Sequence, residues 1–139
     1  MAGAAAPDPR PIAPHLQIWR WHATMLASIL HRVTGVGLYL GMIAVAAWLV
    51  LLARGPDAYG WLDGLFHTWF GQLKLYGLVG VVAFHTFNGV RHFFWDMGAH
   101  FAPRAASFSA MLAVLFAFAA PLALWAALGG FPLTGGGAP

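Results

Sequence analysis

Three long apolar stretches, separated by short segments with charges or prolines, dominate the chain. Val33–Ala53 carries no charged residue, and neither does any position from Ala105 to the C-terminus. The stretch 75–90 is shorter, and it is bounded by Lys74 and Arg91, whose long side chains can reach the membrane interfaces. A helix needs about 20 apolar residues to cross a bilayer. The pattern predicts three transmembrane helices, at about 24–53, 68–97 and 106–129.

The segments outside these helices are rich in helix breakers. Prolines keep the start of the chain extended, so residues 1–23 are expected to form an N-terminal arm at the cytoplasmic interface. Gly55 and Pro56 end the first helix, and the connection 55–67 is expected to be short. Residues 24–130 then make one three-helix transmembrane domain, and residues 131–139 a flexible tail.

Composition supports an all-α membrane protein. The chain is 60% hydrophobic and only 8% charged, whereas soluble domains are about 25% charged. It has no cysteine, so it supplies no thiolate for a disulfide, an iron–sulfur cluster or a zinc site. The Lys and Arg residues are spread singly along the chain, which is not the basic patch that nucleic acid requires.

The charges instead predict a topology. Five arginines precede or open the first helix or flank the second connection: Arg10, Arg20, Arg32, Arg91 and Arg104. The first connection has two basic residues, which two aspartates offset. Because basic residues favour the cytoplasmic side, we expect a cytoplasmic N-terminus and an external C-terminus.

One histidine lies within the second apolar stretch. His85 is ~9 Å deeper than Arg91 along a helix, and a polar ring at that depth is costly, which makes it a functional candidate by default. Gly89 follows one turn later on the same face and leaves room for a planar macrocycle. A haem, another metal, a proton path and a histidine that is simply packed and hydrogen-bonded all remain open.

His92 lies near the end of the same helix. It is ~10.5 Å from His85 along the axis, so the two rings cannot hold one iron between them. A second iron ligand must therefore come from another helix. This chain offers His31 and His67, and a partner chain is the more economical source.

A second polar group opens the first helix. Ser28 and Arg32 are four residues apart and share a face, where a hydroxyl and a guanidinium can bind a carbonyl oxygen of an apolar head group. His31 beside Arg32 suits a haem propionate. The simpler interpretation is an arginine that reaches back to the interface. Arg91 similarly pairs with Asp96 or a propionate, or is a solvated helix end.

Three motifs in order carry a family resemblance. They are RPIAPHL at 10–16, SILHRVTG at 28–35 and HTFNGVRHFFWD at 85–96. Together they resemble the cytochrome b membrane-anchor subunit of succinate dehydrogenase, the larger of its two anchor chains. The motifs and helices cover most of the chain.

The resemblance implies specific roles. His85 matches the axial ligand of haem b, and the small anchor subunit is expected to give the second. Ser28 and Arg32 match the ubiquinone site, and His31 and Arg91 lie in the vicinity of the haem propionates. The role of His92 stays uncertain. The third helix carries no family motif, and Pro121 is expected only to kink it.

The implied function is electron transfer from succinate to ubiquinone in a bacterial inner membrane, with the quinone site toward the cytoplasm. The expected partners are a flavoprotein, an iron–sulfur protein, a second small anchor and membrane lipid; the isolated chain is expected to catalyse nothing. A fumarate reductase anchor and a purely structural anchor are the alternatives. A proton channel would need a polar path through the outer half, where only Tyr39, Gln72 and Tyr76 are polar.

Overall fold

The computed structural model describes residue 15 and residues 17–129. Within them the chain forms four helices and no strand: α1 (Ala23–Ala53), α2 (Pro56–Phe66), α3 (Trp69–Asp96) and α4 (Pro103–Ala127). Helices α1, α3 and α4 are long and apolar enough to cross a membrane. The predicted all-α class with three membrane-spanning helices is confirmed. Most of the predicted arm and the tail lie outside the described residues.

Helix α2 was not predicted. The sequence indicated a short connection at 55–67, but the structure has an 11-residue helix there. Gly55 reverses the chain with a φ of 102°, which only glycine adopts easily. Pro56 then occupies the first turn, where its missing N–H costs nothing, and Asp57 lies at the positive end of the helix dipole.

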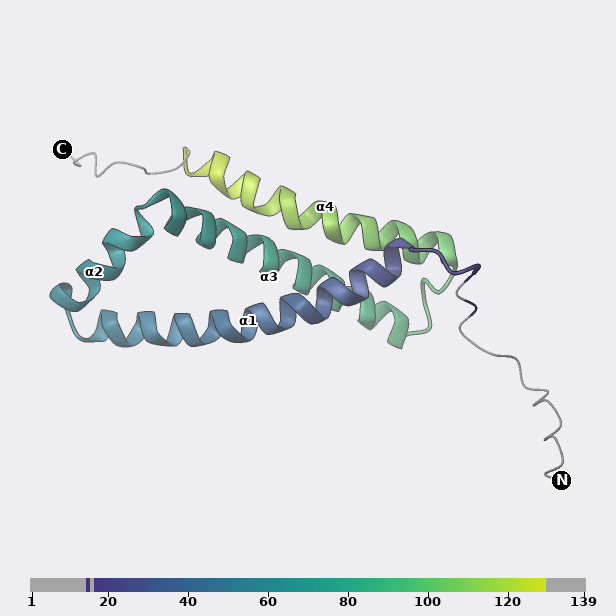
Figure 1. The fold of residues 1–139 in the computed structure, drawn as a ribbon, viewed down its shortest axis with the longest axis horizontal. Helices are drawn as coiled ribbons and strands as arrows, with labels where there is room; N and C mark the ends of the chain where they lie inside the picture. The colour runs from purple at the N-terminus through teal and green to yellow at the C-terminus, as the bar shows by residue number, and fades with distance from the viewer. Residues whose placement is uncertain (1–14, 16, 130–139) are drawn as a thin grey trace, which may run out of the picture.

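Helices α3 and α4 run side by side, whereas α1 crosses α3 near its own start and then diverges toward α2 (Figure 1). The core lies where the three long helices meet. It consists of Phe84 and three alanines, Ala27, Ala110 and Ala113. Small residues let helix backbones approach closely in a membrane protein, which is why this core needs only one large side chain.

Pro121 does more than kink α4. It has no N–H, so the carbonyl of Ala117 loses its usual partner within the helix. That oxygen lies against Gly80 of α3, where an added Cβ would be only 2.7 Å from it. The missing side chain at Gly80 therefore lets the α3 backbone cover the freed carbonyl.

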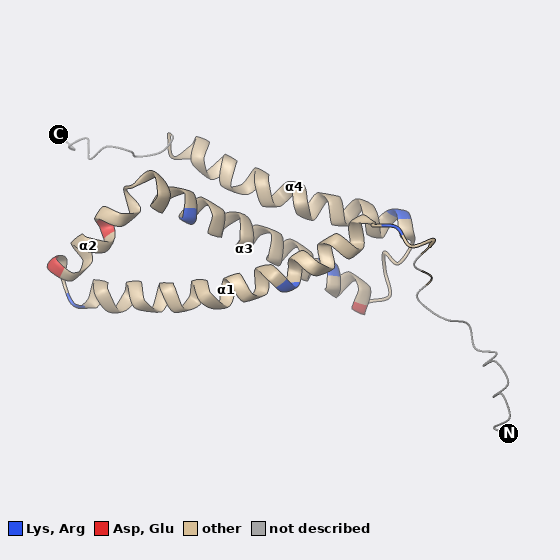
Figure 2. Cartoon of the chain, in the orientation of Figure 1, with Lys and Arg blue, Asp and Glu red and all other residues tan. Residues whose placement is uncertain are grey.

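The outer surface is almost entirely apolar. Large side chains such as Val36, Met42 and Phe118 are 64%, 72% and 73% exposed, and α1 buries Ala27 alone. Charged residues lie toward the two ends of the bundle (Figure 2). This is the distribution that a lipid or partner-helix environment requires.

Candidate functional site

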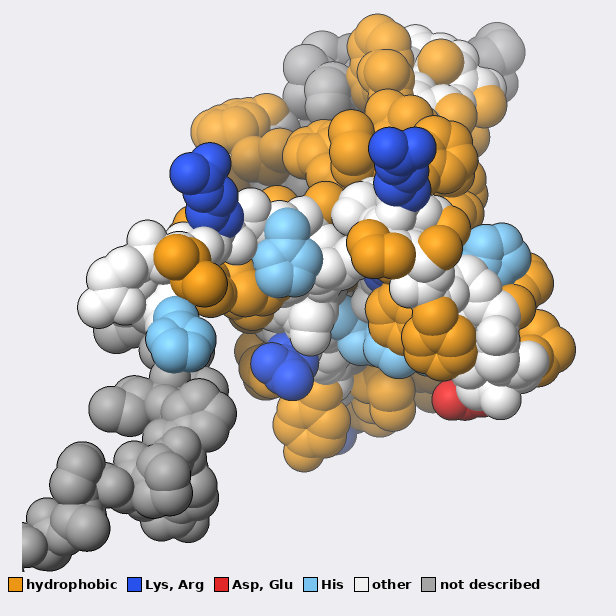
Figure 3. All heavy atoms as spheres, turned by 90° about the vertical axis from the view of Figure 1, so that its right-hand side faces the viewer, with side chains coloured by type: hydrophobic (Ala, Val, Ile, Leu, Met, Phe, Trp, Pro, Cys, Tyr) orange, Lys and Arg blue, Asp and Glu red, His pale blue; other side chains and the backbone are white. Residues whose placement is uncertain are grey.

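Three histidines from two helices meet at the end of the bundle where α1 begins. The ring of His31 on α1 stacks on that of His85 on α3, with centroids 3.9 Å apart and planes 14° apart. The ring of His92 lies 5.3 Å from His31. We call His31, His85 and His92 the histidine cluster. Figure 3 views this end of the molecule, with histidine and arginine side chains among apolar ones.

The sequence did not predict that these rings touch. It placed His31 near the inner boundary and His85 well inside the membrane. Because α1 crosses α3 at this point, the ring of His31 lies between the rings of His85 and His92. It contacts both of them, although they are about two turns apart along α3.

His85 is fixed by two neighbours on α1. Its Nδ1 lies 3.2 Å from Oγ1 of Thr34, and that hydroxyl also donates to the carbonyl of His31 at 3.1 Å. A Cβ added at Gly35 would lie 3.3 Å from Cε1 of His85. Sequence reasoning missed Thr34, although it falls within the SILHRVTG motif.

The other two rings of the cluster differ in their partners. His92 donates from Nδ1 to the carbonyl of Asn88 at 2.7 Å, one turn back on α3. In contrast, Nδ1 of His31 is buried and has no hydrogen-bond partner among the described residues. A buried polar atom without a partner is expensive, so His31 is the ring that has a bond still to make.

Arg91 corrects two expectations. It is not a solvated helix end, because it is only 5% exposed. Within the described part of the chain it forms no ion pair with Asp96 and bonds other partners instead. Its guanidinium donates to Oγ of Ser109 at 3.0 Å, to the carbonyl of Ala106 at 3.1 Å and to Oδ1 of Asn88. Helix α4, whose sequence carries no family motif, thus supplies two of these acceptors, Ser109 and Ala106.

Ser28 and Arg32 share the outward face of α1. Both are exposed, and no hydrogen bond of either side chain occurs within the described residues. They remain available to a ligand or to another chain. Arg32 directly follows His31 of the histidine cluster, and Ser28 precedes His31 by three positions.

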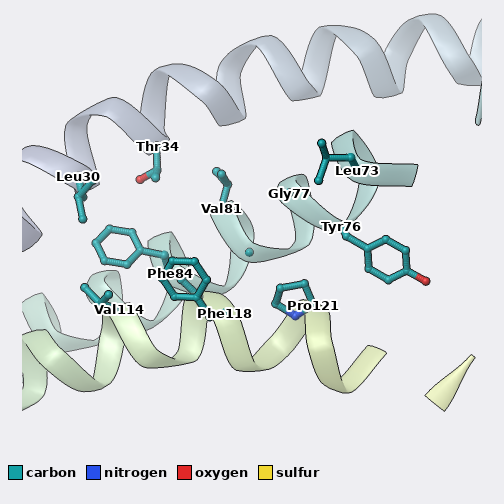
Figure 4. Close-up of a pocket in the computed structure, with 12 residues that line it drawn as sticks. Leu30, Thr34, Leu73, Tyr76, Gly77, Val81, Phe84, Val114, Phe118 and Pro121 are labelled. Carbon is teal, nitrogen blue, oxygen red and sulfur yellow. The ribbon is translucent and has the colours of Figure 1, made fainter. Parts of the chain in front are cut away.

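A cavity lies near the cluster, between α1 on one side and α3 and α4 on the other (Figure 4). Its volume is about 450 Å³. Thr34 and Phe84 line its end nearest the histidines, and apart from Thr34 and Tyr76 its walls are apolar. Such walls suit an acyl or isoprenoid chain rather than a polar head, and Ser28 and Arg32 do not line it.

The arrangement does not by itself enclose a metal ion. Among the described residues no group of three or more histidine and carboxylate side chains converges on one point. A metal that His85 held would thus need ligands from elsewhere. A Cβ at Gly89 would meet nothing within 4 Å, so the space beside that turn of α3 is open.

Comparisons with known proteins agree on one family. Residues 6–124 match the model of the family described as Succinate dehydrogenase/Fumarate reductase transmembrane subunit. A succinate dehydrogenase cytochrome b556 subunit of Paracoccus denitrificans is 35% identical over 89 residues, which cover 64% of this chain and 68% of that protein.

Two further relatives have similar names. A cytochrome b556 subunit from Rickettsia typhi is 30% identical over 116 residues, covering 84% of this chain and 90% of that protein. The mitochondrial succinate dehydrogenase cytochrome b560 subunit of Sus scrofa is 34% identical over 93 residues, covering 64% of this chain and 54% of that protein.

Proposed function

This chain belongs to the succinate dehydrogenase/fumarate reductase transmembrane subunit family, and from that premise we propose that it is the cytochrome b anchor of a succinate dehydrogenase. The relatives above carry that name, and three helices of the chain can cross a membrane. The observation that carries the proposal is the histidine cluster, because an apolar bundle has no structural need for three stacked imidazoles.

The donor set at this end fits a haem b shared with another chain. His85 would be one axial ligand, and the small anchor subunit would provide the other. When bound, haem supplies a one-electron relay. The open space at Gly89 gives a flat ring room beside α3.

Two residues are suited to the haem propionates. The unpartnered Nδ1 of His31 is a ring nitrogen that could bond such an oxygen. Arg91 has five N–H donors and uses three of them for Ser109, Ala106 and Asn88, so two are left. His92 already bonds Asn88, and we assign it a structural role that holds the edge of the cluster.

We assign the quinone head to Ser28 and Arg32. A hydroxyl and a guanidinium one turn apart can both donate to one carbonyl oxygen of ubiquinone. As that oxygen gains charge on reduction, the fixed positive charge of Arg32 stabilises it. Because both residues are exposed on α1, the rest of the pocket would come from the small anchor and the iron–sulfur protein.

The orientation of the helices in the membrane sets the side from which protons reach the quinone. We propose that the start of α1 faces the cytoplasm of a bacterial cell, with the complex in the inner membrane, so that both protons of quinol come from that side. Succinate would be oxidised in a flavoprotein partner. The anchor then positions the quinone, and the isolated chain has no reaction of its own.

The test uses the purified complex. Ser28→Ala and Arg32→Ala are each expected to lower the rate of ubiquinone reduction by succinate at least tenfold. A tenfold loss in rate corresponds to about 1.4 kcal/mol of lost transition-state stabilisation. Succinate oxidation with a soluble artificial acceptor should not change. Arg104→Ala, at the same end of the bundle, is the matched control.

Two outcomes would contradict the proposal. Equal loss of both activities would mean failed assembly instead of a quinone site. A complex without b-type bands in the reduced-minus-oxidised spectrum would remove the haem. A fumarate reductase would be recognised by faster electron flow from quinol to fumarate than from succinate to quinone.

A further inference from the structure

We propose that Thr34 is a positioning residue for His85: its hydroxyl fixes the ring with Nδ1 protonated, so that Nε2 is the nitrogen left for iron. The inference rests on the proposed function, since it assumes that His85 is a haem ligand. It adds a residue on α1 that sets how strongly and in which orientation the ring binds.

The direction of the hydrogen bond follows from counting protons. The Thr34 hydroxyl lies 3.1 Å from the carbonyl of His31 and 3.2 Å from Nδ1 of His85. A carbonyl can only accept, and a hydroxyl has one proton, so both bonds form together only when that proton goes to the carbonyl of His31. In this arrangement the Thr34 oxygen accepts from His85, and Nδ1 carries the hydrogen.

Gly35, which shares a face of α1 with His31, also lies close to the ring of His85. At Gly35 a Cβ would lie 3.3 Å from Cε1 of His85, which is tighter than a relaxed contact. Together with the stacked ring of His31, Thr34 and Gly35 hold the imidazole from three positions on one turn of α1. Thr34 sets its tautomer, and Gly35 and His31 set its plane.

The hydrogen bond between His85 and Thr34 has a chemical consequence. A hydrogen bond from the far nitrogen of a ligating imidazole raises the basicity of the ligand and fixes the orientation of its ring. A more basic ligand favours ferric over ferrous iron. Removing the acceptor should therefore weaken haem binding and raise the midpoint potential of the haem.

The main experiment replaces the hydroxyl without changing the shape of the side chain. In the intact complex, Thr34→Val is expected to lower haem affinity by roughly 10- to 100-fold and to shift the midpoint potential upward. Thr34→Ser keeps the hydroxyl and should restore both values. Thr86→Val is the matched control, since Thr86 is next to His85 in the chain but is exposed.

A second pair of variants tests the plane of the ring. Gly35→Ala should change the g-values of the ferric haem in electron paramagnetic resonance, because they depend on ligand orientation. Gly41→Ala adds the same methyl group against Leu78, at 3.2 Å, two turns away from the histidines. It should leave the spectrum unchanged.

The results separate the two proposals. If the wild-type complex holds no haem, or if His85→Ala retains normal haem, the assignment of His85 fails and the role of Thr34 fails with it. If His85→Ala loses haem while Thr34→Val keeps the wild-type affinity and potential, only the role of Thr34 is overturned. If Thr34→Val does not assemble, Thr34→Ala takes its place: weaker haem binding and a raised potential support the role, and wild-type values overturn it.

Discussion

The two ends of the bundle hold their polar side chains in different ways. At the end where α1 begins, hydrogen bonds join residues far apart in sequence, as between Thr34 and His85, 51 positions apart, and between Arg91 and Ser109, 18 positions apart. At the α2 end they are local. Gln72 donates to the carbonyl of Phe66, six positions away.

The difference separates hydrogen bonds that only hold the fold together from hydrogen bonds that also belong to the candidate site. The local bonds at the α2 end close the corner between α2 and α3. The bonds at the histidine end tie three helices together within the apolar bundle, where no solvent can substitute. They also leave buried atoms of His31 and Asn88 without a hydrogen-bond partner in the described part of the chain, which is typical of a site made for a further component.

The largest effect is expected from removing a histidine at one end and not at the other. His85→Ala should abolish haem binding, whereas His67→Ala, at the α2 end, should leave the haem spectrum unchanged. The side chain of His67 is exposed and, among the residues that the structure describes, bonds only to Asp63, one turn back. An optical spectrum of each purified complex measures its haem content. Loss of haem in both variants would contradict the expected difference between the two ends.

Arg91 should dominate stability at the histidine end. Arg91→Met removes a buried guanidinium with three partners, and hydrogen bonds to charged groups contribute about 1.5–3 kcal/mol, so we expect a loss of that size. The rate of thermal inactivation in detergent is the measurement. Arg104→Met, which changes an exposed arginine at the start of α4, is the control, and equal losses would contradict the network.

Between the two ends, packing of α3 on α4 should be sensitive at one glycine. Gly80→Ala places a methyl group against the carbonyl of Ala117, and overpacking of this kind costs about 1–3 kcal/mol. Gly77→Ala adds the same methyl group where nothing lies within 4 Å and should be neutral. Thermal melting of the two variants compares them directly; similar melting temperatures would mean that α4 shifts to accommodate the methyl group.

The smallest effect belongs to the α2 end. Gln72→Met keeps the volume of the side chain but removes the bond to Phe66, so we expect a loss of about 1 kcal/mol, with haem content and quinone reduction unchanged. Limited proteolysis at the α2 corner should report the local change. Altered electron transfer in this variant would show that the two ends are coupled.

Much of the architecture was predictable because hydropathy is a property of each segment alone. The all-α class, three membrane-spanning helices and the succinate dehydrogenase resemblance are confirmed by the fold and the family match. Helix α2 was missed, since it is only 11 residues long and begins directly after Gly55, where the glycine-proline pair indicated a turn. The roles of Ser28, Arg32 and His85 stay predictions until the variants above are measured.

The sequence by itself determined which residue types lie at which depth: an imidazole within α3, most arginines toward one end, and small residues where helices must approach. It could not determine which of them touch, because contact depends on how far each helix is rotated and where α1 crosses α3. Only the tertiary structure decided that His31 stacks on His85, that Thr34 bonds its ring, and that Arg91 is buried against α4. The physical reason is that burial in lipid can be read from one segment, but a hydrogen bond between helices needs two surfaces in register.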